Sequence, residues 1–214
     1  MNGPELQAKL YAGYVKAALR LGTPYLQYRP TGPANPIASG NLVQSLTAAF
    51  DPAPGFEFHH PALFGKPVWY ALLDGTQTVV GDYLVGSAGT YFIAAMQPLL
   101  PIAAVLCNRV LTINRPAGNA GVGAQPYGGV IAGSEAAELT AWPASVLTKS
   151  RGEMGDTRLP GDVKLPWSEI LLPYGGIELR FGDVILDDNA VRYTVSATER
   201  TDLGWRLLAV QTTA

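Results

Sequence analysis

Apolar and polar positions in residues 1–22 follow a helical period. Apolar side chains recur every three or four residues, at Leu6, Leu10, Tyr14, Val15, Ala18 and Leu21. This pattern predicts an amphipathic helix with Asn2 or Gly3 as its N-cap and Pro4 in its first turn. Gly22 is expected to end the helix in the left-handed conformation. Since a short helix cannot bury its apolar stripe alone, we expect it to dock on the rest of the chain or on a neighbouring subunit.

The helical period ends at residues 23–61, where Pro, Gly, Asn and Ser become frequent. The stretch TPYLQYRPTGPANPIASGN opens this region, and its interleaved Tyr25, Tyr28 and Pro36 indicate a segment that lies against a surface. We predict an extended Pro/Gly-rich arm over these residues. Within the arm, residues 42–50 fit a short strand and a helical turn equally well.

Short strand-like runs fill two later parts of the chain. In residues 62–116, runs rich in β-branched, aromatic and aliphatic side chains occupy residues 68–73, 77–79, 82–85, 91–96, 103–107 and 110–114. In residues 165–214, similar runs occupy residues 170–172, 177–180, 183–186, 192–197 and 205–211. Asp74-Gly75 and residues 86–89 are typical of turns between strands. We therefore predict a mainly β fold with two small antiparallel β-barrel or sandwich-like modules, preceded by the helix and the arm.

Residues 117–164 separate the two modules and are predicted to form a Gly-rich loop and linker. Residues 117–133 are rich in glycine, and residues 150–164 are charged and interrupted by Gly and Pro, as in an exposed loop. Residues 136–147 carry an apolar set that fits a strand.

The two modules resemble each other in sequence. Each contains a tryptophan, a Gly-Asp pair that opens a strand, a tyrosine-led strand and a closing strand, in that order. In the first module these are Trp69, Gly81-Asp82, Tyr91 and residues 103–106; in the second they are Trp167, Gly182-Asp183, Tyr193 and residues 205–208. The pattern predicts two related β-modules, and a chance similarity between β-meanders stays open as the alternative.

Composition and charge narrow the class of protein. Gly (24) and Pro (17) are abundant among the 214 residues, whereas only 15% of the side chains are charged. A hydrophobic fraction of 48% argues against disorder, and a net charge of −2 offers no broad basic face for nucleic acid. No apolar run is long enough for a membrane span, and no signal peptide is visible. Sparse charge suits a subunit of a large assembly, because interface centres are depleted in charged residues.

Motif searches find no nucleotide-binding or hydrolase pattern. Gly65-Lys66 is followed by Pro67, which removes a backbone N–H that a phosphate-binding loop needs. Gly121-Val-Gly123 lacks the third glycine of a dinucleotide fingerprint, and residues 86–89 do not form a Gly-x-Ser-x-Gly elbow. We therefore predict a protein that is not an enzyme, with no catalytic, cofactor-binding or metal-binding residues and no cofactor.

The histidines and the single cysteine have ordinary structural interpretations. Cys107 lies in an apolar run, where a free thiol acts as a small buried hydrophobe, and one cysteine excludes an internal disulfide. His59 and His60 are the only histidines, and adjacent side chains of an extended segment point in opposite directions. A shared metal ion is therefore disfavoured.

The clustered carboxylates and the tryptophans leave one functional alternative open. Neither the group Glu153, Asp156 and Asp162 nor Asp187-Asp188 has the spacing of a calcium loop, and Asp187-Asp188-Asn189-Ala190 is typical of a hairpin turn. A glycan-binding or glycan-cleaving module would need a carboxylate pair beside exposed aromatic rings. We expect Trp69, Trp142, Trp167 and Trp205 to be exposed together if that alternative holds, and buried if it does not.

The stretches GDYLVGSAGTYFIAAMQPLLPIAAVLCNRVLTINRP and GDVILDDNAVRYTVSATERTDLGWRLLAVQ carry a family resemblance. From about residue 11 onward the chain resembles virion-gene products of tailed bacteriophages and prophages. The pattern Gly182-Asp183…Tyr193-x-Val195 is similar to the small β-barrels of head-completion, head–tail connector and tail proteins. In such families the barrels assemble into rings, loops line a channel, and arms or terminal helices clasp neighbouring subunits.

The resemblance implies a structural role in a virion assembled in the host cytoplasm. We expect a ring-forming neck or head–tail connector of six or twelve copies that contacts portal or adaptor, tail-tube or fibre proteins, and no membrane. Its channel would pass DNA non-specifically, and residues 23–48 and 117–133 would reach adjacent subunits. A tail, baseplate or fibre-anchoring role is the first alternative, and the host-surface glycan module is the second.

Overall fold

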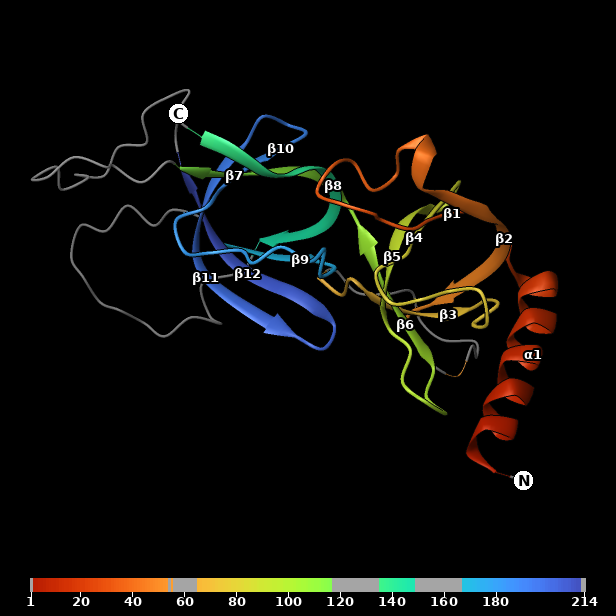
Figure 1. Cartoon of the computed structure of the whole chain (residues 1–214). Helices are drawn as coiled ribbons and strands as arrows, with labels where there is room; N and C mark the ends of the chain where they lie inside the picture. The colour runs from red at the N-terminus through yellow and green to blue at the C-terminus, as the bar shows by residue number, and fades with distance from the viewer. Residues whose placement is uncertain (1, 54, 56–64, 117–134, 149–166, 213–214) are drawn as a thin grey trace, which may run out of the picture.

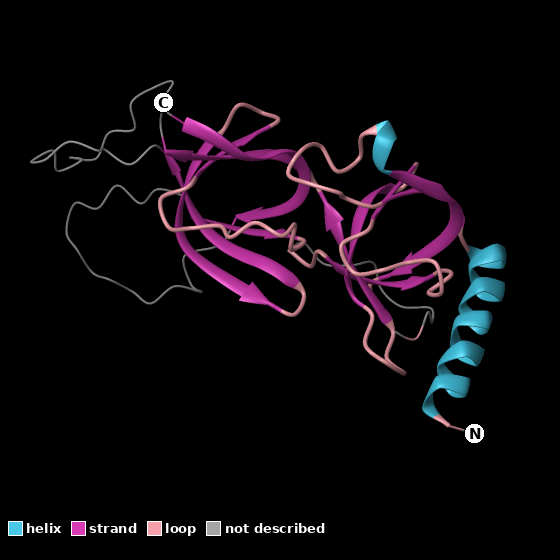
Figure 2. Cartoon of the chain, in the orientation of Figure 1, coloured by secondary structure: helices cyan, strands magenta, loops and turns pink. Residues whose placement is uncertain are grey.

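The chain folds into two closed antiparallel barrels of six strands each, and a helix packs on the first (Figure 1, Figure 2). The computed structural model describes residues 2–53, 55, 65–116, 135–148 and 167–212. The elements are α1 (Gly3–Leu21), β1 (Thr23–Tyr28), the 3-10 helix η1 (Ser39–Asn41), β2 (Leu42–Asp51), β3 (Val68–Leu72), β4 (Tyr83–Gly86), β5 (Gly89–Ala95), β6 (Ile102–Cys107), β7 (Arg109–Pro116), β8 (Glu135–Thr148), β9 (Trp167–Leu172), β10 (Val184–Asp187), β11 (Arg192–Thr201) and β12 (Gly204–Thr212). The predicted mainly β fold of two antiparallel modules with an N-terminal helix is confirmed.

The two barrels have the same strand order. In the first barrel the order is β1-β2-β3-β6-β5-β4, and β4 closes the barrel by pairing with β1. In the second the order is β7-β8-β9-β12-β11-β10, and β10 pairs with β7. Each strand of the second barrel therefore takes the place of the strand six positions earlier. Closure pairs every strand on both sides, so neither barrel presents an open sheet edge.

The predicted arm and linker contribute strands to the barrels. Residues 23–61 do not form one extended arm, because β1 and β2 of this region are the first two strands of the first barrel. Tyr25 and Gln27 are buried while Pro24 and Leu26 face outward, so the period-two alternation of a strand was masked by the prolines. Residues 42–50 belong to a strand rather than a helical turn.

The boundary between the modules also lies elsewhere than predicted. β7, placed by the sequence in the first module, belongs to the second barrel, as does β8 from the predicted linker. Only Asn108 separates β6 from β7, so the chain passes from one barrel to the next without a composition change that would mark the boundary. The apolar run at residues 136–147 lies within β8, as predicted. Residues 117–134 and 149–166 lie outside the described residues.

Helix α1 begins as predicted and ends differently. The Asn2 side chain accepts a hydrogen bond from the Glu5 N–H, and the Glu5 carboxylate accepts one from the Asn2 N–H, forming a capping box. Gly22 is extended (φ −93°) and not left-handed, so the predicted C-cap conformation is wrong. Glycine is required there for another reason, since a Cβ would lie 2.4 Å from the carbonyl oxygen of Ala48 in β2.

Two predicted strands are loops that support the Gly-Asp turns. Residues 77–79 and 177–180 are not strands. In the first barrel the backbone N–H of Val79 donates to Asp82 Oδ2 at 2.9 Å, and in the second the N–H of Arg180 donates to Asp183 Oδ2 at 2.7 Å. In each segment a backbone N–H is therefore bonded to the side chain of Asp82 or Asp183 and not to a neighbouring strand. This is why residues 77–79 and 177–180 lie outside the sheets.

The predicted repeat is confirmed at the Gly-Asp pairs and the tyrosine-led strands. Gly81 N–H donates to Ile93 O at 2.8 Å, and Gly182 N–H donates to Val195 O at 2.9 Å. Both glycines have positive φ (+92° and +84°), a conformation that side chains rarely adopt. The two tyrosine-led strands, β5 and β11, have a register shift at the same place, between Ile93 and Ala95 and between Val195 and Ala197.

The repeat is offset at its two ends. In the first barrel Trp69 pairs with Ala104. Ala209 is the counterpart of Ala104 in the second barrel, and it pairs with Ser168. Trp167 therefore lies one position away from the counterpart of Trp69. For the same reason residues 103–106 are not the counterparts of residues 205–208, because the register makes Ala104 the counterpart of Ala209. Side-chain likeness alone could not detect these short shifts.

Candidate functional site

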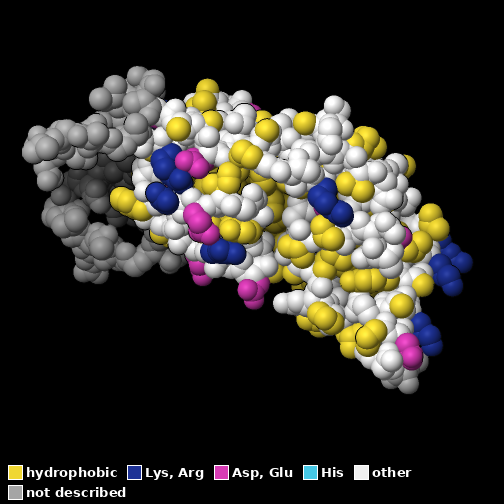
Figure 3. Space-filling model, in the orientation of Figure 1, with side chains coloured by type: hydrophobic (Ala, Val, Ile, Leu, Met, Phe, Trp, Pro, Cys, Tyr) yellow, Lys and Arg dark blue, Asp and Glu magenta, His cyan; other side chains and the backbone are white. Residues whose placement is uncertain are grey.

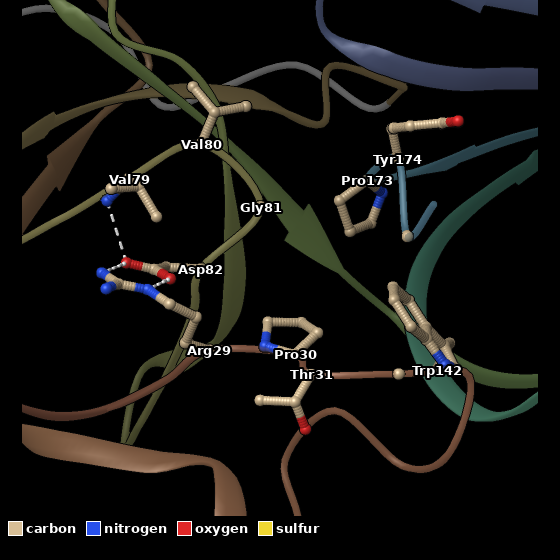
Figure 4. Close-up of a pocket in the computed structure, with 12 residues that line it drawn as sticks. Arg29, Pro30, Thr31, Val79, Val80, Gly81, Asp82, Trp142, Pro173 and Tyr174 are labelled. Carbon is tan, nitrogen blue, oxygen red and sulfur yellow. Dashed lines mark hydrogen bonds and ion pairs between the residues drawn. The ribbon is translucent and has the colours of Figure 1, made fainter. Parts of the chain in front are cut away.

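The clearest hollow formed by both barrels is a crevice of about 250 Å³ between them (Figure 4). From the first barrel it is lined by the loop after β1, including Arg29 and Thr31, and by Val79 and Val80 of the turn before β4. From the second barrel it is lined by Trp142 of β8 and by the loop after β9, with Pro173, Tyr174 and Gly175. These residues come from four separate parts of the chain, so the crevice exists only in the folded protein.

An arginine–aspartate pair forms the polar wall of the crevice. Arg29 Nε donates to Asp82 Oδ1 and Arg29 Nη2 to Asp82 Oδ2, both at 2.8 Å (Figure 4). The Asp82 carboxylate is fully buried and also accepts from Gln27 Nε2 at 2.6 Å. Hydrogen bonding to Asp82 raises the pKa of the Arg29 guanidinium. A bidentate pair of this kind fixes both side chains and links the end of β1 to the turn before β4.

The second barrel contains the same pair in the same place. Arg115 Nε donates to Asp183 Oδ1 and Arg115 Nη2 to Asp183 Oδ2, both at 2.9 Å. Arg29 Nη2 also donates to the carbonyl oxygen of Gln77 at 3.2 Å, and Arg115 Nη2 donates to that of Glu178 at 2.8 Å. We call these two constellations the clasps. Hydrogen bonding to Asp183 raises the pKa of Arg115.

The clasps are built for structure rather than for acid–base chemistry. Each aspartate accepts two bonds from an arginine and one from a backbone N–H, so its oxygens face donors of the protein itself. A carboxylate so paired holds its arginine and the preceding turn in a fixed geometry. The same pair recurring in both barrels is explained by topology, since both clasps join the same two strands.

Apolar contacts hold the two barrels together beside the crevice. Trp142 is fully buried, its ring lies edge-on to Tyr83 with centroids 6.1 Å apart, and its Nε1–H donates to Pro33 O at 2.9 Å. The buried Tyr83 hydroxyl donates to Pro143 O at 2.8 Å, and burial raises the Tyr83 pKa well above its usual value. Tyr83 and Phe92 of the first barrel belong to the same apolar core as the centre of the second. The barrels therefore form one packed unit.

Apolar side chains also remain on the outer surface (Figure 3). The largest exposed ones include Leu19 and Leu21 on α1, Val79 and Val80 before β4, Leu99 and Leu100 in the β5–β6 loop, and Phe181 before β10. Phe181 is 79% exposed, the highest value in this group. Such residues on a folded chain indicate contact surfaces when they gather at defined places.

The tryptophans do not form the exposed group that a glycan module would need. Trp142 and Trp205 are buried in the core of the second barrel and its interface, whereas Trp69 and Trp167 are partly exposed on equivalent strands of different barrels. The Trp205 Nε1–H donates to Ile177 O at 3.2 Å. Neither expected outcome is met, because the four tryptophans are not exposed together and are not all buried.

The other candidates have structural roles or lie outside the described residues. Cys107 ends β6 against the core, and burial raises the pKa of its thiol. Asp187 begins the predicted hairpin turn, where the Ala190 N–H donates to Asp187 O at 3.0 Å. Among the described residues no three His, Cys, Asp or Glu side chains are grouped to hold a metal ion. His59, His60, Gly121, Gly123, Glu153, Asp156 and Asp162 lie outside the described residues.

Sequence reasoning missed the two arginines of the clasps. A signal for them exists, because Arg29-Pro30-Thr31-Gly32 recurs as Arg115-Pro116-Ala117-Gly118. Each Arg-Pro pair stands where the first strand of its barrel ends. The predicted repeat begins at Trp69 in one module and at Trp167 in the other, and the Arg-Pro pairs precede it in segments predicted to be an arm and the edge of a loop.

Comparisons with known proteins find no counterpart of the chain. No family model matches it, and searches of curated proteins and of solved structures give no match. Of the helices in the described part of the chain, none combines the length and the apolar character needed to cross a bilayer.

Proposed function

We propose that the chain is a structural component of a tailed-phage virion, most specifically a ring-forming neck or head–tail connector protein of six or twelve copies. One observation carries this proposal: two barrels of identical topology share an apolar core within one chain, and large apolar side chains remain exposed on α1 of the first barrel and beside the clasp of the second. A tandem of like barrels offers like surfaces in series, which suits repetition around a ring. The family resemblance of the two modules and the sparse charge point the same way.

The mechanism of such a protein is surface matching between copies and with neighbouring virion proteins. Obligate interfaces commonly bury more than roughly 2,000 Å², and apolar area contributes about 25 cal/mol per Å² before the entropy of association is subtracted. The clasps contribute by holding each barrel rigid, because an ordered surface loses less conformational entropy on binding.

The experiment is deletion of the gene in the phage or prophage that encodes the chain, followed by electron microscopy of the particles. A neck or head–tail connector predicts filled heads and complete tails that are not joined. Joined particles with altered tail tips would instead assign the chain to the tail, baseplate or fibre anchor. Normal, infectious particles would overturn the structural role, and a complementing plasmid copy serves as the control for each outcome.

A further inference from the structure

One end of the first barrel contains a hollow of about 560 Å³, beside the point where α1 passes into β1. It is lined by early residues of β1, β3 and β5 and by late residues of β2 and β6, which lie at the same end of the barrel. Hollows of roughly 300–1,000 Å³ are the usual size of small-molecule sites. We call this hollow the barrel mouth.

Four aromatic rings form most of the wall of the barrel mouth. They belong to Tyr25, Phe50, Trp69 and Tyr91. Phe50 is stacked on Tyr91 with an interplanar angle of 4°, whereas Tyr25 and Trp69 stand at 72° and 80° to the Tyr91 ring. The rings therefore face in different directions around the mouth, as the walls of a box do.

The charge of the lining favours a cation. Among the described residues that line the barrel mouth none is basic, and Asp51 is the one charged residue. Its Oδ1 accepts a hydrogen bond from the Ala53 N–H at 2.7 Å, which fixes the carboxylate at the end of β2. The faces of aromatic rings are electronegative and attract cations, those of tryptophan most strongly.

The same end of the second barrel holds a cation of the protein itself. Arg109 is the counterpart of Thr23, because each begins the first strand of its barrel and pairs with an alanine of the second. Arg109 Nε lies 3.8 Å from Asp187 Oδ2, and the hydroxyl of Tyr193 donates to the same oxygen at 3.1 Å. Tyr193 is the counterpart of Tyr91, so this guanidinium lies close to the equivalent of a ring of the barrel mouth.

The first barrel has neither of these charged groups at the equivalent positions. Gly86 is the counterpart of Asp187, and a Cβ on Gly86 would lie 2.5 Å from the ring of Tyr25. Trp69 stands where the second barrel has Ser168. Where the second barrel has an ion pair, the first therefore has aromatic rings around a space that the side chains lining it do not fill.

We propose that the barrel mouth binds an organic cation of the alkylated ammonium class, held by the rings of Phe50, Trp69 and Tyr91. The ligand corresponds to the Arg109 guanidinium of the second barrel. An alkylated ammonium group suits aromatic walls because its charge is spread over apolar carbon and needs no hydrogen-bond partner. Choline-type molecules and methylated lysine side chains both carry this group. The site goes beyond the proposed virion role and does not depend on it.

The experiment is a ligand-observed NMR titration of the full chain with choline chloride at constant ionic strength. The matched probe is dimethylbutanol, the analogue of choline in which a neutral carbon replaces the charged nitrogen. Choline should bind at least about fivefold more tightly, because only the cation is attracted by the ring faces. Equal affinities for the two probes, or no binding of choline, would overturn the proposal.

Trp69→Leu tests the aromatic wall, because it removes a ring and keeps an apolar side chain. The buried Trp69 Nε1–H has no hydrogen-bond partner within the described structure, so leucine removes no hydrogen bond. The affinity for choline should fall at least about fivefold. Trp167→Leu, at a partly exposed tryptophan of the second barrel, is the matched control and should bind choline as the parent does. Parent-like binding by Trp69→Leu contradicts the proposal.

Thr23→Arg gives the first barrel the side chain that the second has at this place. Thr23 is exposed, so folding is expected to be intact. The new guanidinium competes for the rings, and the affinity for choline should fall at least about fivefold, whereas Thr23→Gln, long but neutral, should change it less than about twofold. The same affinity in both variants would show that no cation occupies the barrel mouth.

A peptide that contains trimethyllysine distinguishes the two sources of the cation. Tighter binding of the peptide than of choline would assign the barrel mouth to a methylated side chain of a partner protein, and tighter binding of choline would assign it to a free molecule. Either result supports the cation site, and binding of neither probe overturns it. The particle phenotype judges the virion role separately.

Discussion

The two barrels share one topology but are stabilised by different side chains. In the first, Tyr25, Phe50 and Tyr91 form an aromatic cluster, with Phe50 stacked on Tyr91 at a centroid distance of 3.8 Å. The equivalent positions of β7 and β8 in the second hold Leu111 and Val146. The second barrel carries ion pairs between its strands and loops. They join Arg192 to Glu135, Arg206 to Glu169 and Glu199, and Arg200 to Glu178.

What the barrels have in common is what their topology requires. The clasp, the positive-φ glycine and the register shift occur in both, whereas packing and surface charge differ. In each barrel a glycine with positive φ makes the sharp turn before the strand that closes the barrel, and an arginine–aspartate pair links that turn to the first strand. Few residue types can provide either feature. Core volume can be filled by many combinations of apolar side chains, so it diverges between the copies.

The largest effect is expected where the two barrels meet. Trp142→Ala should lower the free energy of unfolding by about 4 kcal/mol, because it removes a fully buried indole, its contact with Tyr83 and its hydrogen bond to Pro33. Leu46→Ala, at the equivalent but only partly buried position of the first barrel, should cost about 1–2 kcal/mol. Urea unfolding measures both values. Equal losses would mean that the interface between the barrels is not the main stabilising contact at Trp142.

The clasps should have similar energetic roles in the two barrels. Asp82→Ala and Asp183→Ala should each cost about 3 kcal/mol, because each leaves an arginine and a backbone N–H without their acceptor. Asp202→Ala, in an exposed turn, serves as the control and should change stability by less than about 0.5 kcal/mol.

A double variant sharpens the result for the clasps. Removing both partners, as in Asp82→Ala with Arg29→Ala, should cost less than the sum of the two single substitutions, because no charge is left unpaired. If only one of the two clasps lowered the free energy of unfolding when removed, the two clasps would share their geometry but not their contribution to stability.

The smallest expected effect is the loss of stability at alkaline pH through Tyr91 and Tyr193, which occupy equivalent positions in the two barrels. Burial raises the pKa of Tyr91 and that of Tyr193 to about 12, and the Asp187 carboxylate adds to the shift at Tyr193. The folded state therefore holds these protons more tightly than the unfolded state. Their contribution, at most about 3 kcal/mol each, is complete below pH 10.0 and lost as pH rises toward about 12.

Tyr91→Phe and Tyr193→Phe test this pH dependence. Each should flatten the fall of the unfolding free energy over that interval, measured by urea unfolding at successive pH values. Tyr193→Phe should also cost about 1 kcal/mol near neutral pH, because the Tyr193 hydroxyl donates to Asp187 Oδ2 at 3.1 Å. An unchanged alkaline slope in Tyr91→Phe would contradict the burial of its hydroxyl group.

The sequence predicted those parts of the fold whose signals are local. The helix α1, its Asn2 cap and the hairpin turn at Asp187 depend on residues a few positions apart, and all three are confirmed, although Leu6 and Leu21 of the predicted apolar stripe are exposed. The clasps depend on partners far apart in the chain: Arg29 and Asp82 are separated by 53 positions, and Arg115 and Asp183 by 68. Only register across closed barrels brings such pairs together, and no local pattern encodes register between distant strands.

Proline-rich composition misled the prediction at β1. Pro24 lies in the strand, and Pro30 follows it, yet Tyr25 pairs with Leu46 on one side and Gly86 on the other. A proline is tolerated where its missing N–H falls outside the hydrogen-bonding ladder. Composition therefore indicated an arm, while the barrel required a strand at that place to close.

The sequence alone determined that this protein is mainly β with two modules and an N-terminal helix, because turn glycines, alternating side chains and a helix cap act over a few residues. Only the tertiary structure decided that both modules close into barrels, that the chain changes barrel at Asn108, and that α1 packs on the core of the first barrel. These features depend on which distant strands pair and on which apolar faces remain to be covered. Both are determined by the packing of the complete chain and not by any short segment of it.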